Sequence, residues 1–228
     1  AESDTLGVVY TPSYIDGFDV SIDYYSIRVT DAVSQIQPGA ALQSCYIDDP
    51  NPNNPLCGAV LRDPNTGFIS TAIVNDFNLA AIEQAGIDLA ANYVFDAPMD
   101  LGGRFRLSYQ GNFVTKQTRQ NNSTVAEVDC KGTYGSACSG DFASILQADY
   151  KHRATFDWQL DTMNFQLGWR RIGEVDYAVD RTETISAQDY MDFAASWQAT
   201  DTIAVNFGID NLFDKAPPTP EIGSNHFN

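Results

Sequence analysis

The chain has 228 residues, of which 43% are apolar and 19% are charged, enough for the core of one β domain or two small ones. Its formal net charge of -17 argues against nucleic-acid binding, which requires a basic surface, and solvated acidic loops explain it most simply. No apolar run is long enough to cross a membrane as a helix, but the strands of membrane barrels alternate and escape that criterion.

Alternation of apolar and polar residues with period two is the dominant pattern in the chain, and it predicts β-strands. Each alternating segment has one apolar and one polar face. The first two segments alternate less regularly than the rest. In chain order, about eight main strands are expected, at 5–12, 18–29, 86–95, 104–113, 151–160, 163–170, 191–199 and 203–209.

The connections between these segments differ in length in a regular way. Short breaks fall at 13–17, 96–103, 161–162 and 200–201, and long polar stretches at 34–76, 119–148 and 178–187. The weak strand FISTAIV is expected to form a hairpin inside the first long stretch. Short and long connections then alternate, as short periplasmic turns and long extracellular loops do in outer-membrane barrels.

A soluble β-sandwich also alternates and is the main structural alternative. Aromatic residues near strand ends, truly polar faces and the loop asymmetry together favour a membrane barrel. The residues expected to face lipid are Phe156, Trp158, Phe165, Trp169, Phe193 and Trp197. The lumen-facing candidates are Asp88, Arg104, Arg106, Lys151, Arg153, Asp157, Arg170, Asp192 and Asp210, most of them as structural ion pairs and wall contacts.

Four cysteines stand in two near pairs, within stretches rich in Asn, Asp, Pro, Gly and Ser that look exposed. Neither pair has the spacing of a zinc site, and free cysteines prefer buried positions. Disulfides Cys45–Cys57 and Cys130–Cys138 on the extracellular side fit better than four free thiols, and they imply an oxidising compartment.

The chain ends in GIDNLFDKAPP and a further loop, although strands dominate everything before it. GIDNLFDKAPP resembles the penultimate strand and loop of the TonB-dependent receptor family, with Asn211, Leu212, Phe213 and Asp214 as its motif. VVYTPSYIDGFDVSIDYYSIRVTDAVSQI resembles that family's paired strands around a periplasmic turn. The Cys45 loop followed by NLAAIEQAGIDLAANYVF resembles the continuation, so the resemblance covers essentially the whole chain.

The resemblance implies an all-β antiparallel transmembrane barrel of about 22 strands with a plugged lumen, in the bacterial outer membrane. Residues 1–228 would be a partial C-terminal barrel of about eight strands, without the plug domain and the final strand. Both edge strands, those from Thr5 and Thr202, should then pair with segments outside this sequence. The implied partners are the rest of the barrel, its plug, membrane lipid, a small nutrient and an inner-membrane energising complex.

No GxSxG, HExxH or phosphate-binding glycine loop occurs, so no enzyme activity and no cofactor are expected. His152 is expected at the membrane interface and His226 in a solvated loop. The Asp48–Asp49 pair is better explained as a solvated turn than as a cation site. The implied function is energy-coupled import of a ferric chelate, vitamin or oligosaccharide, captured by loops 35–66 and 119–148. The alternatives are a passive porin and a soluble extracellular sandwich for binding or adhesion.

Overall fold

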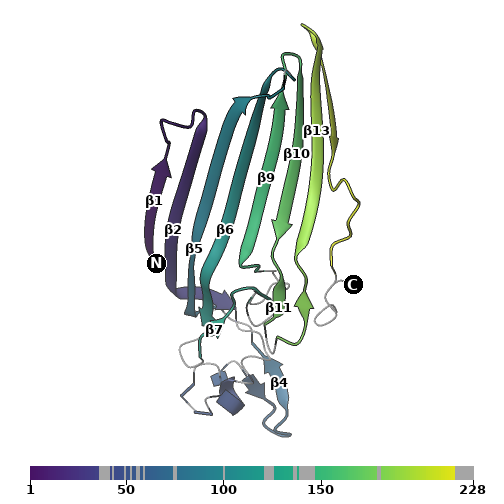
Figure 1. The fold of residues 1–228 in the computed structure, drawn as a ribbon. Helices are drawn as coiled ribbons and strands as arrows, with labels where there is room; N and C mark the ends of the chain where they lie inside the picture. The colour runs from purple at the N-terminus through teal and green to yellow at the C-terminus, as the bar shows by residue number, and fades with distance from the viewer. Residues whose placement is uncertain are drawn as a thin grey trace.

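The computed structural model describes residues 1–218 except 36–41, 43, 49, 52, 55–56, 59, 74–75, 100, 121–125, 136–137, 139–146 and 179–180. One antiparallel sheet dominates it, with eight long strands in the order β1-β2-β5-β6-β9-β10-β13-β14 (Figure 1). Their bounds are β1 Glu2–Tyr10, β2 Phe18–Gln35, β5 Asp76–Asp96, β6 Arg104–Gln120, β9 Tyr150–Gln159, β10 Met163–Ile172, β13 Gln188–Thr200 and β14 Ile203–Ile209. The all-β antiparallel fold and the eight main strands are therefore confirmed.

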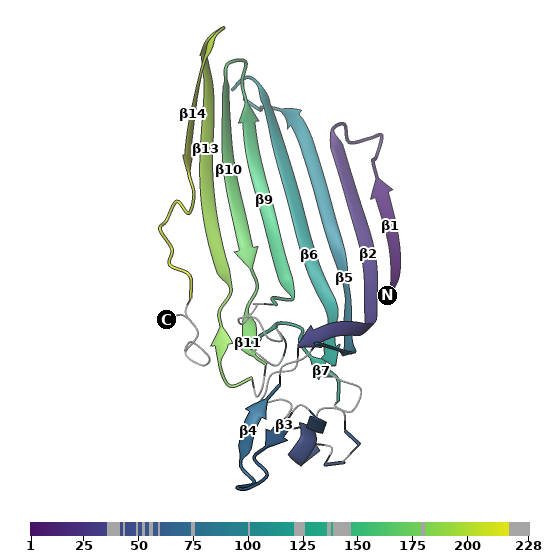
Figure 2. The ribbon, with the colours of Figure 1, turned by 180° about the vertical axis from the view of Figure 1, so that it is seen from behind.

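All short connections lie at one end of this sheet and all long ones at the other, as the loop lengths predict (Figures 1 and 2). Glycine is required where two of the short turns touch a neighbouring strand. Gly17 and Gly103 both have φ of +76°, and a Cβ on either would lie 2.1 Å from the backbone oxygen of Val94 or Gln159. An L side chain would be strained at both positions and would collide there, so these glycines fix the tight turns.

Three strands run further toward the long loops than their alternation indicates. β2, β5 and β6 contain 18, 21 and 17 residues, so β5 begins at Asp76, inside the region expected to be loop. β-bulges interrupt the ladders between Val29 and Ala32 and between Ala85 and Gly86. A bulge breaks the period-two pattern, which is why the sequence underestimated these strands.

The long connections contain short elements of their own. β3 (Val60–Arg62) pairs with β4 (Ile69–Ala72), so the hairpin expected from FISTAIV is confirmed, and a π-helical turn, η1 (Ser44–Asp48), precedes it. β7 (Val128–Asp129) pairs with β6, while β8 (Thr133–Tyr134), β11 (Val175–Tyr177) and β12 (Thr184–Ile185) form a separate three-stranded sheet.

The two outermost strands, β1 and β14, do not pair with each other within the described part of the chain. Each has one hydrogen-bonded neighbour, β2 or β13, in that part. The described sheet is therefore not a small closed barrel, in agreement with the expectation that the strands from Thr5 and Thr202 do not pair with each other.

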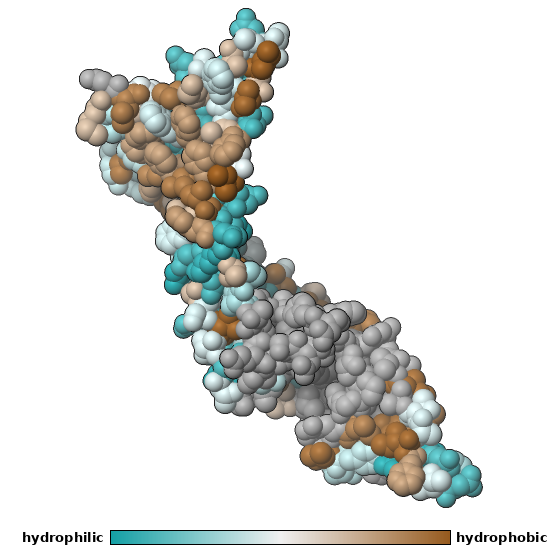
Figure 3. Space-filling view, turned by 90° about the vertical axis from the view of Figure 1, so that its right-hand side faces the viewer, coloured by the Kyte–Doolittle hydropathy of each residue, from teal (hydrophilic) through white to brown (hydrophobic). Residues whose placement is uncertain are grey.

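Buried apolar residues are scarce in the main sheet. Most of those among the described residues lie in the long connections, and Ala85 and Val114 are the exceptions in the long strands. Strand residues such as Leu6 (72% exposed) and Phe207 (55% exposed) are open instead. In the side view of Figure 3, hydrophobic residues gather over the end with the short turns, and hydrophilic residues separate them from the loops. A β-sandwich would bury the exposed apolar residues of these strands under a second sheet, so the sandwich alternative is wrong.

Candidate functional site

One face of the main sheet is polar along its length, and we call it the polar face. Residues directly opposite each other on neighbouring strands point to the same side, so the register assigns each residue to a face. Arg106 lies opposite Asp157, Arg153 opposite Arg170, and Gly168 opposite Asp192. Eight of the nine lumen-facing candidates share the polar face through such pairs, and the ninth, Asp210, immediately follows β14.

The other side of the sheet is the apolar face, and the six aromatic residues expected to face lipid share it. One row across five strands consists of Leu107, Phe156, Leu167, Phe193 and Ile209. Trp169 lies opposite Met191, and Trp197 lies opposite Met163 and Val205. The register thus separates the polar and aromatic residues as the alternation predicts.

Two aromatic belts border the apolar face. The short-turn belt is a chain of rings with centroids 4.7 to 6.2 Å apart, namely Phe18, Tyr93, Phe95, Phe105, Trp158 and Phe165. The loop-end belt contains Tyr109, Phe113, Tyr150, His152 and Trp169. Each indole N–H donates to a polar partner, Trp158 to the Gly102 carbonyl (3.1 Å) and Trp169 to Asp189 (2.9 Å). Such rings with one apolar and one polar end suit a boundary between oil and water.

Beyond the loop-end belt, the same side of the sheet becomes charged. Asp189 accepts a hydrogen bond from Arg171 at 2.7 Å, and Glu83 pairs with Lys116 at 2.8 Å and Arg28 at 3.7 Å. Along β9, Trp158 in one belt is eight residue steps from Tyr150 in the other, which is about 26 Å of strand. At the strand tilt of about 35–45° in outer-membrane barrels, this length spans roughly 20 Å, somewhat less than their apolar band of about 25 Å.

His152 is nearly buried, with 7% of its surface exposed, and lies on the apolar face at the loop-end belt. Its Nδ1 lies 2.6 Å from the Tyr150 hydroxyl, and its ring makes a T-shaped contact with Trp169 at 4.3 Å between centroids. Gly111 stands directly opposite on β6, where a Cβ would collide with the Tyr109 hydroxyl at 2.6 Å. His152 therefore lies on the apolar face as expected, and its place at a membrane interface stays a prediction.

A groove of about 520 Å³ lies at the loop end of the polar face. Two like-charged pairs stand directly opposite each other there, Asp23 with Asp88 and Arg153 with Arg170. Between them, on β6, lie the amides Gln110 and Asn112, and Lys151 stands opposite Asn112 on β9. Ser21 lies beside Asp23 on β2, and Tyr190 lies beyond Arg170 on β13. One end of the groove is therefore acidic, the other is basic, and hydrogen-bonding amides lie in the middle.

Hydrogen bonds from amides outnumber ion pairs among the lumen-facing candidates that the structure describes. Arg170 binds Asp192 through two hydrogen bonds of 2.7 and 2.9 Å, the only ion pair within the nine lumen-facing candidates in the described residues. Asp88 instead accepts a hydrogen bond from Asn112 (2.7 Å), and Asp157 one from Gln166 (2.8 Å). Amides next to the acids satisfy the carboxylates, and Arg104, Arg106, Lys151 and Arg153 form no ion pair with the acidic residues that the structure describes.

The second and third long connections fold together into what we call the loop module, the described parts of 126–149 and 173–187. β8 runs parallel to β11, with Thr133 opposite Asp176 and Tyr134 opposite Tyr177. The Tyr134 side chain is 1% exposed and packs with Ala148, Val175 and Ile185. Two connections that are separate in sequence therefore share one small hydrophobic core.

The disulfide Cys130–Cys138 closes one side of the loop module. Both cysteines are buried, at 1% and 3% exposed, so the expectation of exposed cysteine segments is wrong for this pair. The polar residues beside Cys130 are covered as well, since Thr133 is fully buried and its hydroxyl donates to the Cys130 carbonyl at 2.9 Å. Hydrogen bonds from Val114 to Asp149 and from Gly173 to Tyr150, both 2.7 Å, join the module to the strands below it.

Glu183 ties the two connections of the loop module together from the other side. It accepts a hydrogen bond of 2.5 Å from the hydroxyl of Tyr134, and its backbone oxygen accepts one from Tyr177. Burial, and then the bond to this carboxylate, raises the pKa of the Tyr134 phenol well above its ordinary value.

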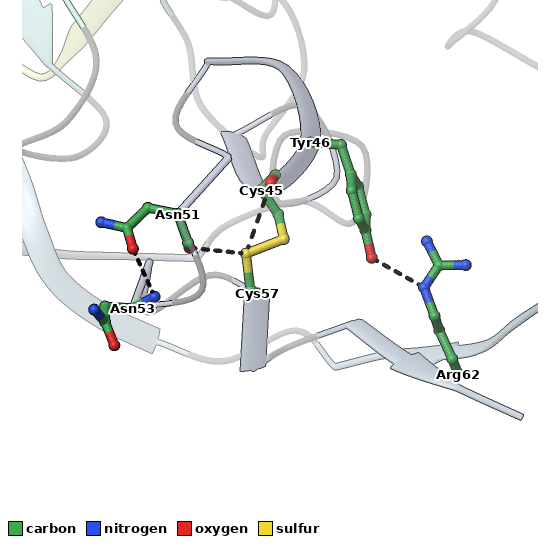
Figure 4. Close-up of a disulfide and its surroundings, with 6 residues drawn as sticks. All are labelled: Cys45, Tyr46, Asn51, Asn53, Cys57 and Arg62. Carbon is green, nitrogen blue, oxygen red and sulfur yellow. Dashed lines mark hydrogen bonds between the residues drawn. A yellow bond between two sulfur atoms is a disulfide. The ribbon is translucent and has the colours of Figure 1, made fainter. Parts of the chain in front are cut away.

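The first long connection carries the other disulfide, Cys45–Cys57, shown in Figure 4. Near it, the Arg62 side chain from β3 donates to the Tyr46 hydroxyl at 3.1 Å, and its guanidinium lies 5.0 Å from the centre of the ring. An Asx turn forms between Asn51 and Asn53. Both expected disulfides are thus present, and this one fixes η1 beside the β3–β4 hairpin.

Two further expectations concern residues outside the described part of the chain, Asp49 of the acidic pair and His226. Within the described ranges, no group of three or more His, Cys, Asp or Glu residues is arranged to hold a metal ion. The same ranges contain no helix long and apolar enough to cross a membrane.

The sequence matches the profile of the family described as TonB dependent receptor-like, beta-barrel, over residues 3–212. The chain belongs to this family. Its members are receptors and transporters, so the resemblance noted from the NLFD motif and the paired strands is confirmed. No curated protein sequence matches the chain.

Solved structures support the same fold for this receptor-family chain. The ferric enterobactin receptor PfeA of Pseudomonas aeruginosa is similar, with a TM-score of 0.57 and 15% identity over 93% of this chain and 25% of that one. The siderophore receptor PirA of Acinetobacter baumannii has a TM-score of 0.56 and 14% identity over 93% of this chain and 27% of that one. The ferric yersiniabactin receptor FyuA of Yersinia pestis has a TM-score of 0.55 and 16% identity over 93% of this chain and 24% of that one. The chain spans about a quarter of the length of these structures.

Proposed function

We propose that this chain is part of the barrel wall of an outer-membrane receptor that imports a scarce nutrient with energy from an inner-membrane complex. The observation that carries the proposal is the family match together with one open sheet whose polar and apolar residues lie on opposite faces. Binding and transport, rather than catalysis, are the proposed activities. The rest of the barrel and the plug would pair with and fill this wall.

The proposed orientation places the apolar face against lipid and the long connections outside the cell. The two belts and the charged residues beyond the loop-end belt support it, because aromatic girdles border the apolar band of such barrels. The two disulfides lie on the proposed extracellular side, where an oxidising environment preserves them.

The polar face would line the lumen, and the groove at its loop end is the proposed place where a nutrient meets the wall. Loops 35–66 and 119–148 are the proposed capture segments, since they rise from the same end of the sheet. Three similar structures are receptors for ferric enterobactin, ferric yersiniabactin or a siderophore. These names favour a ferric chelate over a vitamin or an oligosaccharide as the nutrient.

Uptake in intact cells tests the proposal against a passive porin. Bacteria that express the whole protein would be supplied with a radiolabelled ferric chelate, with and without a working energising complex. We expect accumulation against a gradient that stops when the complex is deleted or the proton gradient collapses. Uptake that continues unchanged would instead identify a passive pore.

A further inference from the structure

The NLFD motif directly after β14 folds into a closed turn. Asn211 and Asp214 both have left-handed backbone conformations, with φ of 55° and 48°, which Asn and Asp tolerate better than most residues. The Asn211 side chain accepts a hydrogen bond from the backbone N–H of Lys215 and donates one to its carbonyl, both 3.0 Å long. The backbone of Asp214 also donates to the Asn211 carbonyl at 2.8 Å. Three hydrogen bonds therefore close residues 211–215 into one unit.

Asp192 on β13 anchors this turn to the sheet. One of its carboxylate oxygens accepts a hydrogen bond from the backbone N–H of Asn211 at 2.9 Å. The same carboxylate accepts two hydrogen bonds from Arg170 on β10. Leu212 adds a backbone bond to the Met191 carbonyl at 2.6 Å. One side chain thus joins two strands and the segment that leaves a third.

The anchored turn ends beside the groove on the polar face. The Lys215 ammonium lies 6.0 Å from the centre of the Tyr190 ring, and the Arg170 guanidinium lies 5.6 Å from it. Tyr190 and Arg170 both line the groove. Attraction between cations and the ring therefore holds Lys215 at the basic end of the groove.

We propose that Asp192 is a positioning residue that fixes the 211–215 turn at the rim of the groove, with Arg170 orienting its carboxylate. The chain leaving β14 then starts from a fixed point, and Lys215 has a defined place beside Tyr190. Within the motif, Asn211 closes the turn and presents the N–H that Asp192 binds, and Asp214 supplies the second left-handed position. A charged acceptor is suited to this role because hydrogen bonds to ionised groups are the stronger ones.

A spin label at position 213 measures the proposed effect. Phe213 is 73% exposed and the described cysteines are all in disulfides, so Phe213→Cys offers one reactive thiol with little disturbance. In the whole protein in detergent, we expect an immobilised label. Asp192→Ala should produce a mobile label and make backbone hydrogen exchange at 211–215 roughly tenfold faster or more.

Asp189→Ala is the matched control, because Asp189 also lies on β13 and also pairs with an arginine of β10, Arg171 at 2.7 Å. Among the described residues, Asp189 makes no hydrogen bond to the 211–215 turn and has only a through-space attraction to Lys215, so its loss should leave the label immobile. An equal effect of both substitutions would mean a general loosening of the β10–β13 pair and would overturn the proposal. An immobile label in Asp192→Ala would overturn it as well.

A charge exchange separates the two roles of Asp192. The double variant Arg170→Asp with Asp192→Arg restores an ion pair, but the new arginine cannot accept a hydrogen bond from the Asn211 N–H. We expect the label to stay mobile. A return to the parent spectrum would show that the ion pair alone matters and that Asp192 does not position the turn.

If the exchanged variant does not assemble, Arg170→Met answers the remaining question. It keeps an unbranched side chain and leaves Asp192 able to bind Asn211, so exchange at 211–215 should rise by less than in Asp192→Ala. Unchanged exchange would overturn the orienting role of Arg170.

Discussion

The sheet wall and the loop module are both built from β-strands, but they are stabilised in different ways. The wall has strands of up to 21 residues and a continuous ladder, yet few of its described apolar side chains are buried within the chain. The loop module has strands of two or three residues, a buried tyrosine and a disulfide. The wall therefore depends on its surroundings for apolar burial, and the loop module carries its own core.

The largest expected effect tests the dependence of the wall on a lipid environment. Phe156 lies in the middle row of the apolar face, and Phe156→Arg should destabilise the folded protein in bilayers by about 2–4 kcal/mol. Chemical unfolding from lipid vesicles measures it. Thr155→Arg, at the neighbouring position on the polar face, is the control and should cost little. Equal costs at 155 and 156 would contradict the assignment of the two faces.

Loss of the Cys130–Cys138 disulfide tests the independence of the loop module. The double variant Cys130→Ser with Cys138→Ser should destabilise the module by about 2–3 kcal/mol in the chain-entropy account. Because the core is shared, hydrogen exchange should accelerate in β8 and also in β11, 43 residues further along. The long strands should stay protected. Faster exchange in β8 alone would mean that the two connections do not form one unit.

Alkaline pH offers a reversible version of the same test. The pKa of Tyr134 is raised in the folded module, so the phenol stays protonated there at a pH where the unfolded segment ionises. The stabilisation that the protonated phenol gives to the folded module is complete below about pH 10, the ordinary pKa of a phenol. Above that pH it is lost at about 1.4 kcal/mol per pH unit. Hydrogen exchange of β8 and β11 between pH 8 and 11.5, corrected for the intrinsic rate, should reveal the decline. Tyr134→Phe should remove this part of the pH dependence, and a profile identical to that of the parent would contradict the assignment.

The smallest expected effect concerns the charged residues beyond the loop-end belt. Glu83 pairs with Lys116 and Arg28, whose side chains are largely open to solvent. Glu83→Gln should therefore change the unfolding midpoint only slightly, and less still in high salt. A shift as large as that of Phe156→Arg would show that this cluster belongs to the stabilising core of the wall.

Much of the wall could be predicted from the sequence because each strand signals itself locally. Phe156 and Trp158 alternate with Arg153 and Asp157, and this spacing alone assigns them to opposite faces. The turns could also be placed, since glycines and polar residues mark 13–17 and 96–103. The ends of β2 and β5 could not, because bulges interrupt the alternation there.

The candidate site was less accessible to sequence reasoning. The acid pair Asp23 and Asp88 meets across two strands only because one register is chosen, and Asp23 gave no separate signal. The roles of Tyr134 and Glu183 could not be seen either, since strands of two residues have no periodicity to detect. The near spacing of Cys130 and Cys138 was the one local signal from that module.

Local chemistry determined the strands, their two faces, both disulfides and the family of this protein, because alternation, cysteine spacing and the NLFD motif all lie within short stretches of chain. Only the tertiary structure decided that β8 pairs in parallel with β11 and that Asp192 binds both Arg170 and Asn211. These features join residues between 19 and 43 positions apart. Such contacts depend on register and on loop closure, and no short stretch of sequence encodes them.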